Sequence, residues 1–99
     1  MRTIKYFVDA LDEEIEGAKE YAEKYIECKA KENMNTASRF KEMSYDELKH
    51  ASYIHEMAVS EIEKINKVFK PPESMIEKWE KAHKQYVEKA AWVRQMLEM

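Results

Sequence analysis

The sequence predicts an all-α fold, in which a long helical hairpin is followed by a C-terminal helix and two chains pair into a four-helix bundle. The 99 residues contain one Gly and two Pro, too few for a fold of many short strands and tight turns. Apolar residues recur at helical spacing in three segments. Two paired helices of about 30 residues, roughly 45 Å each, have a thin core that a second copy would complete. We therefore expect one domain over residues 1–99 and a homo-oligomer, a dimer or larger.

The first helix is predicted over residues 3–32. Its apolar positions follow helical spacing and leave Glu and Lys on the opposite face. They are Ile4, Phe7, Val8, Leu11, Ile15, Ala18, Ala22, Tyr25 and Ile26. Asn33 and Asn35 are expected to end this helix, because Asn tolerates the left-handed conformation and is a good N-cap for the next helix.

The second helix is predicted over residues 36–69. Its expected buried stripe is Ala37, Phe40, Met43, Ile54, Met57, Ala58, Ile62, Ile65, Val68 and Phe69. A capping-box pattern from Ser44 to Glu47 offers an alternative start at Ser44. We favour the earlier start, because Phe40 and Met43 continue the same stripe.

The third helix is predicted over residues 72–97. Pro71-Pro72 stops the second helix, and Pro is well placed in the first turn of the next one. Helical spacing continues through Ile76, Trp79, Ala82, Tyr86, Ala90, Val93 and Leu97.

Composition narrows the classes of partner and compartment. The formal net charge of −3 gives no basic footprint for nucleic acid. No apolar run approaches the roughly 18 residues of a membrane span, and the N-terminal segment becomes acidic too early for a secretory signal. The single cysteine, Cys28, cannot form an internal disulfide, so a reducing cytoplasm is the expected location.

One acidic residue interrupts the apolar stripe of the first helix. Glu14 lies three residues after Leu11 and four before Ala18. Glu13 and Glu16 are rotated from Glu14 by roughly 100° and 200°, so Glu14 points most nearly inward. The only glycine, Gly17, follows one turn later. Its missing side chain either leaves room beside Glu14 or is simply a tolerated glycine at the edge of the stripe.

Two polar residues fill the gap in the stripe of the second helix. Glu47 and His50 are three residues apart, so their side chains lie on one face. A lone buried carboxylate is costly unless it is paired or binds a metal, and oxygen with imidazole nitrogen suits iron, manganese or zinc. The spacing alone is a weak signal, and it recurs at Glu80 and His83 on a more polar face. His55 lies off the stripe and is expected on the surface.

Glu14 on the first helix together with Glu47 and His50 on the second is a more specific signal for a metal site than either helix alone. A twofold dimer would bring together four glutamates and two histidines, the ligand set of di-iron and di-manganese sites in four-helix bundles. Four carboxylates would balance two divalent cations. Without metal, the same carboxylates would repel one another, which should raise their pKa values.

These residues resemble the ferritin-like superfamily, most closely its half-ferritin (encapsulated ferritin) type. The likeness rests on EEIEGAKEY at residues 13–21 and DELKHA at residues 46–51. It implies that Glu14, Glu47 and His50 hold a di-iron site, with manganese as the other metal, between two subunits. It also implies that Tyr21 lies beside the ligands and that Glu13 and Glu16 gather metal outside them. The implied activity is Fe(II) oxidation by O2.

A second hypothesis needs no metal. The same bundle could dimerise through a polar seam at Glu14, Glu47 and His50, and serve as a structural or assembly component, for example of a phage or a multi-subunit complex. In either case the C-terminal helix is the segment that would dock a protein shell or another assembly partner.

Overall fold

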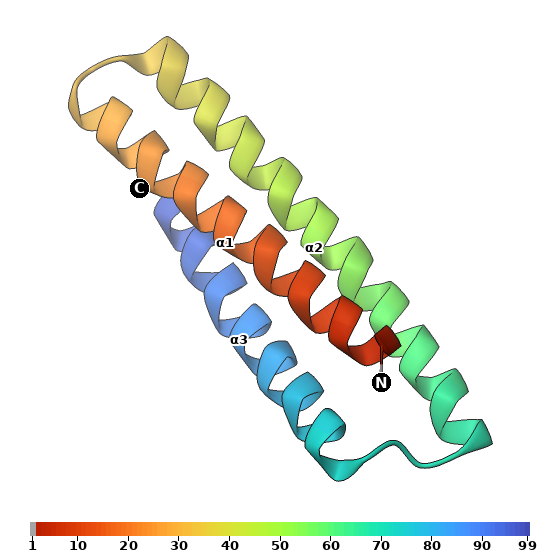
Figure 1. The fold of residues 1–99 in the computed structure, drawn as a ribbon. Coiled ribbons are helices and arrows are strands. Elements are labelled where there is room, and N and C mark those ends of the chain that lie inside the picture. The colour runs from red at the N-terminus through yellow and green to blue at the C-terminus, as the bar shows by residue number, and fades with distance from the viewer. Residues whose placement is uncertain (1) are drawn as a thin grey trace.

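Three helices make up the computed structural model, which describes residues 2–99 (Figure 1). They are α1 (Arg2–Ala30), α2 (Met34–Val68) and α3 (Glu73–Leu97), and no strand occurs within residues 2–99. The all-α prediction is confirmed, and the observed helix ends lie within two residues of the predicted ones. Among these residues, no helix is both long enough and apolar enough to cross a membrane.

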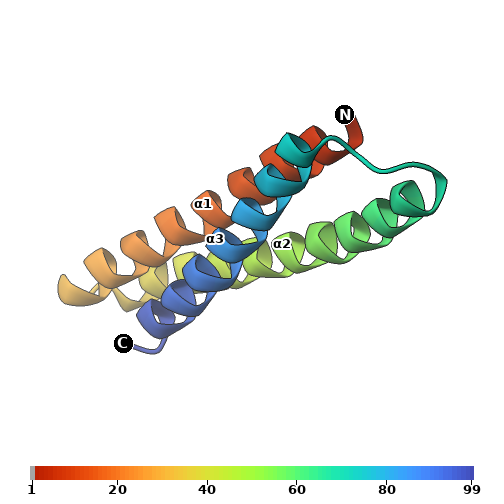
Figure 2. The same cartoon turned by 90° about the horizontal axis from the view of Figure 1, so that it is seen from below.

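The helices form an elongated rod measuring 55 × 18 × 17 Å. α1 and α2 pair as the predicted antiparallel hairpin, and α3 returns in the direction of α1 (Figure 1). α3 packs mainly on α1 and has few contacts with α2. Figure 2 shows the C-terminal part of α2 diverging from the other two helices, with the linker after Val68 spanning the gap. One side of the hairpin therefore carries α3, and within residues 2–99 no helix covers the other side.

The two connections are built differently. At the end of α1, Glu32 takes the left-handed conformation with φ of 60°. Its N–H donates to the carbonyl of Lys29, and the N–H of Asn33 donates to that of Cys28, which is the Schellman arrangement. The residue that turns the chain is thus Glu32 rather than Asn33. At the second connection, Pro72 is the N-cap of α3, so the helix begins at Glu73, one residue after the predicted start.

The core follows the predicted stripe of α1 closely. Ile4, Phe7, Leu11, Ile15, Ala18, Ala22 and Tyr25 are all buried. α3 contributes Ala90, Val93, Met96 and Leu97, all from its C-terminal part. The three helices therefore share a core mainly in the half of the rod where α3 ends.

The buried stripe of α2 differs from the prediction. Ala37, Ser44, Leu48, Ala51 and Ala58 are buried, whereas Met43 and Met57 are 40% and 51% exposed. Small side chains let α2 approach α1 closely, so the contact face is rotated away from the two methionines. The alternative start at Ser44 is also wrong, because Ser44 lies inside α2 and its hydroxyl donates to the Ala18 carbonyl at 2.7 Å.

His55, which is predicted on the surface, is partly covered by side chains of α3. Its ring is partly buried and stacks against Trp79 and Tyr86 of α3. Its Nε2 lies 2.7 Å from Nδ1 of His83. The sequence pattern of α2 alone could not show this contact, because α3 supplies all three partners.

Candidate metal centre

The structure brings Glu14, Glu47 and His50 together near the middle of the α1–α2 hairpin. Each offers one ligand atom, and these atoms lie within 4.8 Å of one another. His50 Nδ1 is 3.6 Å from Glu14 Oε2 and 3.6 Å from Glu47 Oε1. The antiparallel pairing places one turn of α1 beside one turn of α2, so the two predicted interruptions of the apolar stripes meet.

The three side chains differ in their access to water. The side chains of Glu14 and Glu47 are 27% and 25% exposed, and that of His50 is 52% exposed. Glu14 Oε2 is itself buried, and no described residue outside the cluster donates a hydrogen bond to it. Because an unpaired buried carboxylate oxygen is costly, this atom favours a cation or a proton at the cluster.

Electrostatics at the cluster favour a shared proton when no metal is bound. Hydrogen bonding with the neighbouring Glu14 carboxyl is the largest effect on Glu47, followed by partial burial and by repulsion between the two charges. Together they raise the pKa of Glu47 from 4.5 to about 7, although His50 opposes the change. A divalent cation would remove the cause of this shift, because it favours both carboxylates in the charged form.

Gly17 gives the Glu47 carboxylate its place against α1. A Cβ atom at position 17 would lie 2.9 Å from Glu47 Oε2, closer than real Cβ contacts allow. A side chain at this position would push the carboxylate outward. Of the two sequence interpretations of Gly17, the structure supports the one in which its missing side chain leaves room at the cluster.

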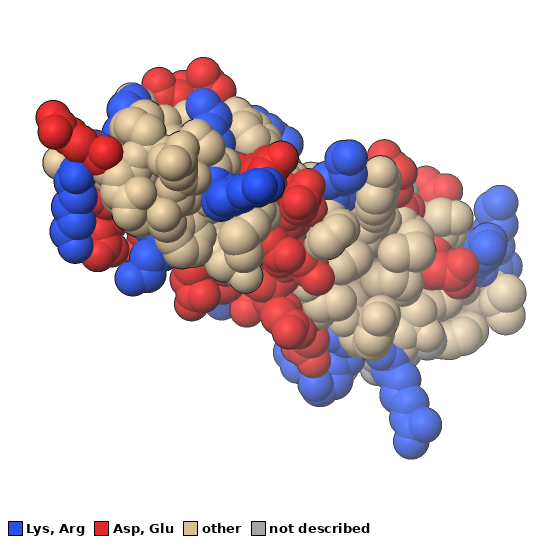
Figure 3. Space-filling model, turned by 90° about the horizontal axis from the view of Figure 1, so that it is seen from above, with Lys and Arg blue, Asp and Glu red and all other residues tan. Residues whose placement is uncertain are grey.

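An acidic hollow of about 600 Å³ opens beside the cluster. Its lining includes Glu13, Glu14, Glu16, Tyr21 and Glu47. Figure 3 shows acidic side chains forming a band across the middle of the rod, with uncharged surface on both sides of it. The residues predicted around the metal ligands therefore border one continuous hollow.

Tyr21 and Glu16 also have partners elsewhere in the chain. The Tyr21 ring stacks on Phe40, with the ring centres 6.1 Å apart. The Glu16 carboxylate accepts a hydrogen bond from Lys89 of α3, and this bond lowers the pKa of Glu16. Glu16 thus stays ionised at the edge of the hollow, already paired with a cation. Glu13 is exposed and has the freer carboxylate.

No protein-family model matches the sequence, and neither a curated protein nor a solved structure matches it. Any functional inference therefore depends on the geometry of the cluster and on the sequence resemblance.

Proposed function

We propose that this chain is a ferritin-like metal-binding protein, in which two hairpins pair into a four-helix bundle and hold two iron ions, or two manganese ions, between them. The observation that carries the proposal is the convergence of Glu14, Glu47 and His50 from two helices, with ligand atoms within 4.8 Å of one another. The unpaired buried oxygen of Glu14 supports it, because a cation would satisfy that atom.

One chain alone does not complete such a site. It supplies two carboxylates and one imidazole, whereas a di-metal centre in a four-helix bundle takes four glutamates and two histidines. The side chain of His50 is half exposed, so a second chain could reach it. A twofold axis near His50 would place a second set of ligands against the first and neutralise four carboxylates with two divalent cations.

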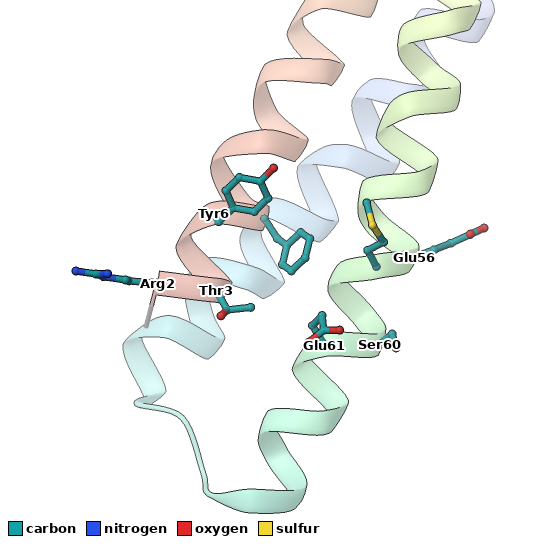
Figure 4. A pocket seen from close by; sticks show the side chains of 8 residues that line it. Arg2, Thr3, Tyr6, Glu56, Ser60 and Glu61 are labelled. Carbon is teal, nitrogen blue, oxygen red and sulfur yellow. The ribbon is translucent and has the colours of Figure 1, made fainter.

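Apolar surface beside the cluster suits contact with a second copy. Tyr6, Met43 and Met57 are large side chains exposed along the hairpin. Between the start of α1 and the C-terminal half of α2, Tyr6, Phe7 and Met57 line a hollow of about 700 Å³, together with Arg2 and Glu61 (Figure 4). Exposed apolar surface of this kind marks protein–protein contact sites.

The residues have distinct parts in this proposal. Glu14 and Glu47 provide hard oxygen ligands and His50 provides a nitrogen ligand, a set that suits iron or manganese. From the resemblance, Tyr21 lies beside the ligands, and Glu13 and Glu16 attract cations into the acidic hollow. Bound as substrate, Fe(II) would be oxidised to Fe(III) by O2, one electron leaving each iron. Because Glu47 holds its proton up to about pH 7, metal uptake releases a proton and strengthens as the pH rises.

The test is an anaerobic Fe(II) titration of metal-free protein, with the mass followed by light scattering, and then admission of O2. We expect one iron per chain, two per dimer, and a ferric absorbance that appears rapidly after O2 is added. Glu47→Gln should lose both signals. Glu80→Gln alters the other Glu-x-x-His pair, which lies on α3, and should retain both.

Failure to bind metal would refute the metal proposal. If the protein binds no iron and still forms a stable dimer, the cluster of Glu14, Glu47 and His50 is a polar seam between two chains. The structural or assembly hypothesis would then replace the metal proposal. If iron binds equally well to wild type and Glu47→Gln, the metal lies elsewhere on the chain.

A further inference from the structure

The two halves of α3 are held to the hairpin in different ways. The C-terminal half buries Ala90, Val93 and Leu97 in the common core. It also donates a hydrogen bond from Lys89 to Glu16, and Glu98, the residue after α3, accepts one from Tyr45. The N-terminal half contributes no fully buried residue, and α3 as a whole has few contacts with α2.

A cluster of four rings links the N-terminal half of α3 to α2. The His55 ring of α2 stacks with Trp79, His83 and Tyr86 of α3, at centre-to-centre distances of 5.6, 4.8 and 5.0 Å. The three interplanar angles all lie between 21° and 29°. Within the cluster, His55 Nε2 and His83 Nδ1 are hydrogen-bonded at 2.7 Å. We call these two residues the histidine pair.

The histidine pair can hold only one proton between its facing nitrogens. When both rings are neutral, one facing nitrogen donates and the other accepts. A first added proton can sit on an outward nitrogen and leave this bond intact. A second added proton puts N–H groups on both facing nitrogens and makes both rings cationic, so the bond is lost and the rings repel each other.

The charges around the pair set the direction of this effect. Burial lowers the pKa of His55 below its ordinary value of 6.5, and the charge of His83 lowers it further. Glu56 of α2 opposes them. Tyr86 of α3 also faces His55, through the stacked phenol ring. No charged group among the described residues of α1 affects the pKa of His55.

The sign of the pH dependence follows from this shift. When α3 is detached, His55 is in water and takes up its proton near pH 6.5. When α3 is docked, His55 takes it up only at lower pH. The docked state therefore keeps its full stability above pH 6.5. It loses stability as the pH falls below 6.5, until the lowered pKa has been passed.

We propose that the histidine pair is an acid-sensitive contact, which releases residues 73–86 of α3 from α2 when both rings are protonated while residues 90–97 stay docked. The release uncovers Leu11 and Ile15 of α1, which line a groove under α3 together with Lys78 and Lys81. This groove adjoins the turn of α1 that carries Glu14. The proposal does not depend on metal binding.

Hydrogen–deuterium exchange of the full-length protein tests the proposal. Protection factors, which correct for intrinsic exchange, are compared at pH 7.5 and pH 5.0 with a chelator present. We expect the protection of residues 73–86 to fall on the order of tenfold at pH 5.0, while that of residues 90–97 stays unchanged. His55→Phe keeps a ring in the stack without a titrating group and should abolish the pH dependence.

The remaining histidine provides a matched control. His50→Gln removes a histidine from the same helix but outside the ring cluster, and should keep the fall in protection. His83→Gln leaves an amide that can hydrogen-bond to His55 in either protonation state, and should weaken the pH dependence. Exchange of residues 73–86 that is independent of pH in wild type would overturn the proposal. So would an equal fall in His55→Phe, or an equal loss in residues 90–97, which would indicate global unfolding.

Discussion

Replacing Glu47 with Gln should stabilise the metal-free protein at alkaline pH. Gln resembles the protonated form of Glu47, because its amide can donate to Glu14 and carries no charge. Wild type must instead ionise Glu47 beside Glu14 as the pH rises. A carboxyl whose pKa is raised on folding makes the folded state bind more protons than the unfolded state, so stability falls as the pH rises from about 4.5 to about 7.

The expected size of this stabilisation follows from the raised pKa of Glu47. A pKa raised from 4.5 to about 7 corresponds to about 3 kcal/mol at 1.36 kcal/mol per unit. Because a quarter of the Glu47 side chain faces solvent, water screens the repulsion. We therefore expect the pH-dependent difference in the free energy of unfolding to be about 1 to 2 kcal/mol. The advantage of Glu47→Gln over wild type should be small at pH 5 and should grow by this amount by pH 8.

Urea unfolding at pH 5, 6, 7 and 8 measures this difference, with chelator present and one protein concentration throughout. Comparing the two proteins at each pH cancels other titrating groups, such as Glu16 and His55. Glu42→Gln removes an exposed carboxylate from the same helix and controls for the loss of one negative charge. A difference that does not change between pH 5 and pH 8 would refute the electrostatic account of the cluster.

Two further predictions concern packing. Ser44→Ala should lower the free energy of unfolding by about 1 kcal/mol, because the fully buried hydroxyl loses its bond to the Ala18 carbonyl; an unchanged urea midpoint would contradict this. Leu97→Ala should lower the free energy of unfolding by about 2 to 4 kcal/mol, because Leu97 is fully buried. Val87→Ala, at an exposed position of the same helix, should change it by less than about 0.5 kcal/mol. Equal losses in the two variants would mean that the end of α3 is not docked as described.

The stripe of α1 could be read from the sequence because its buried side chains are mostly large or clearly apolar. Ile4, Leu11 and Ile15 stand out against the Glu and Lys between them. In α2 the contact face consists largely of Ala and Ser, whose hydropathy does not distinguish core from surface. Met43 and Met57 are more hydrophobic than Ser44 and Ala51, so a pattern based on hydropathy selects the wrong side of the helix.

The meeting of Glu14, Glu47 and His50 could be anticipated because it needs only local geometry. Two residues three apart share a helix face, and an antiparallel hairpin sets which turn of α1 they meet. The contact between His55 and His83 joins helices that barely touch, across 28 residues of sequence. Its register depends on the conformation of the linker from Phe69 to Pro72, for which the spacing of apolar residues carries no information.

The direction of the helices has a mechanical consequence. α1 and α3 run parallel, so the Arg2 end of α1 and the C-terminal end of α3 lie at opposite ends of the rod (Figure 1). A force applied between these two ends would slide α3 along α1 rather than peel it away one turn at a time. All side chains in the contact between α1 and α3 would then resist together. A tether joined at residue 73 instead of the C-terminus would open the same contact progressively, at a lower force.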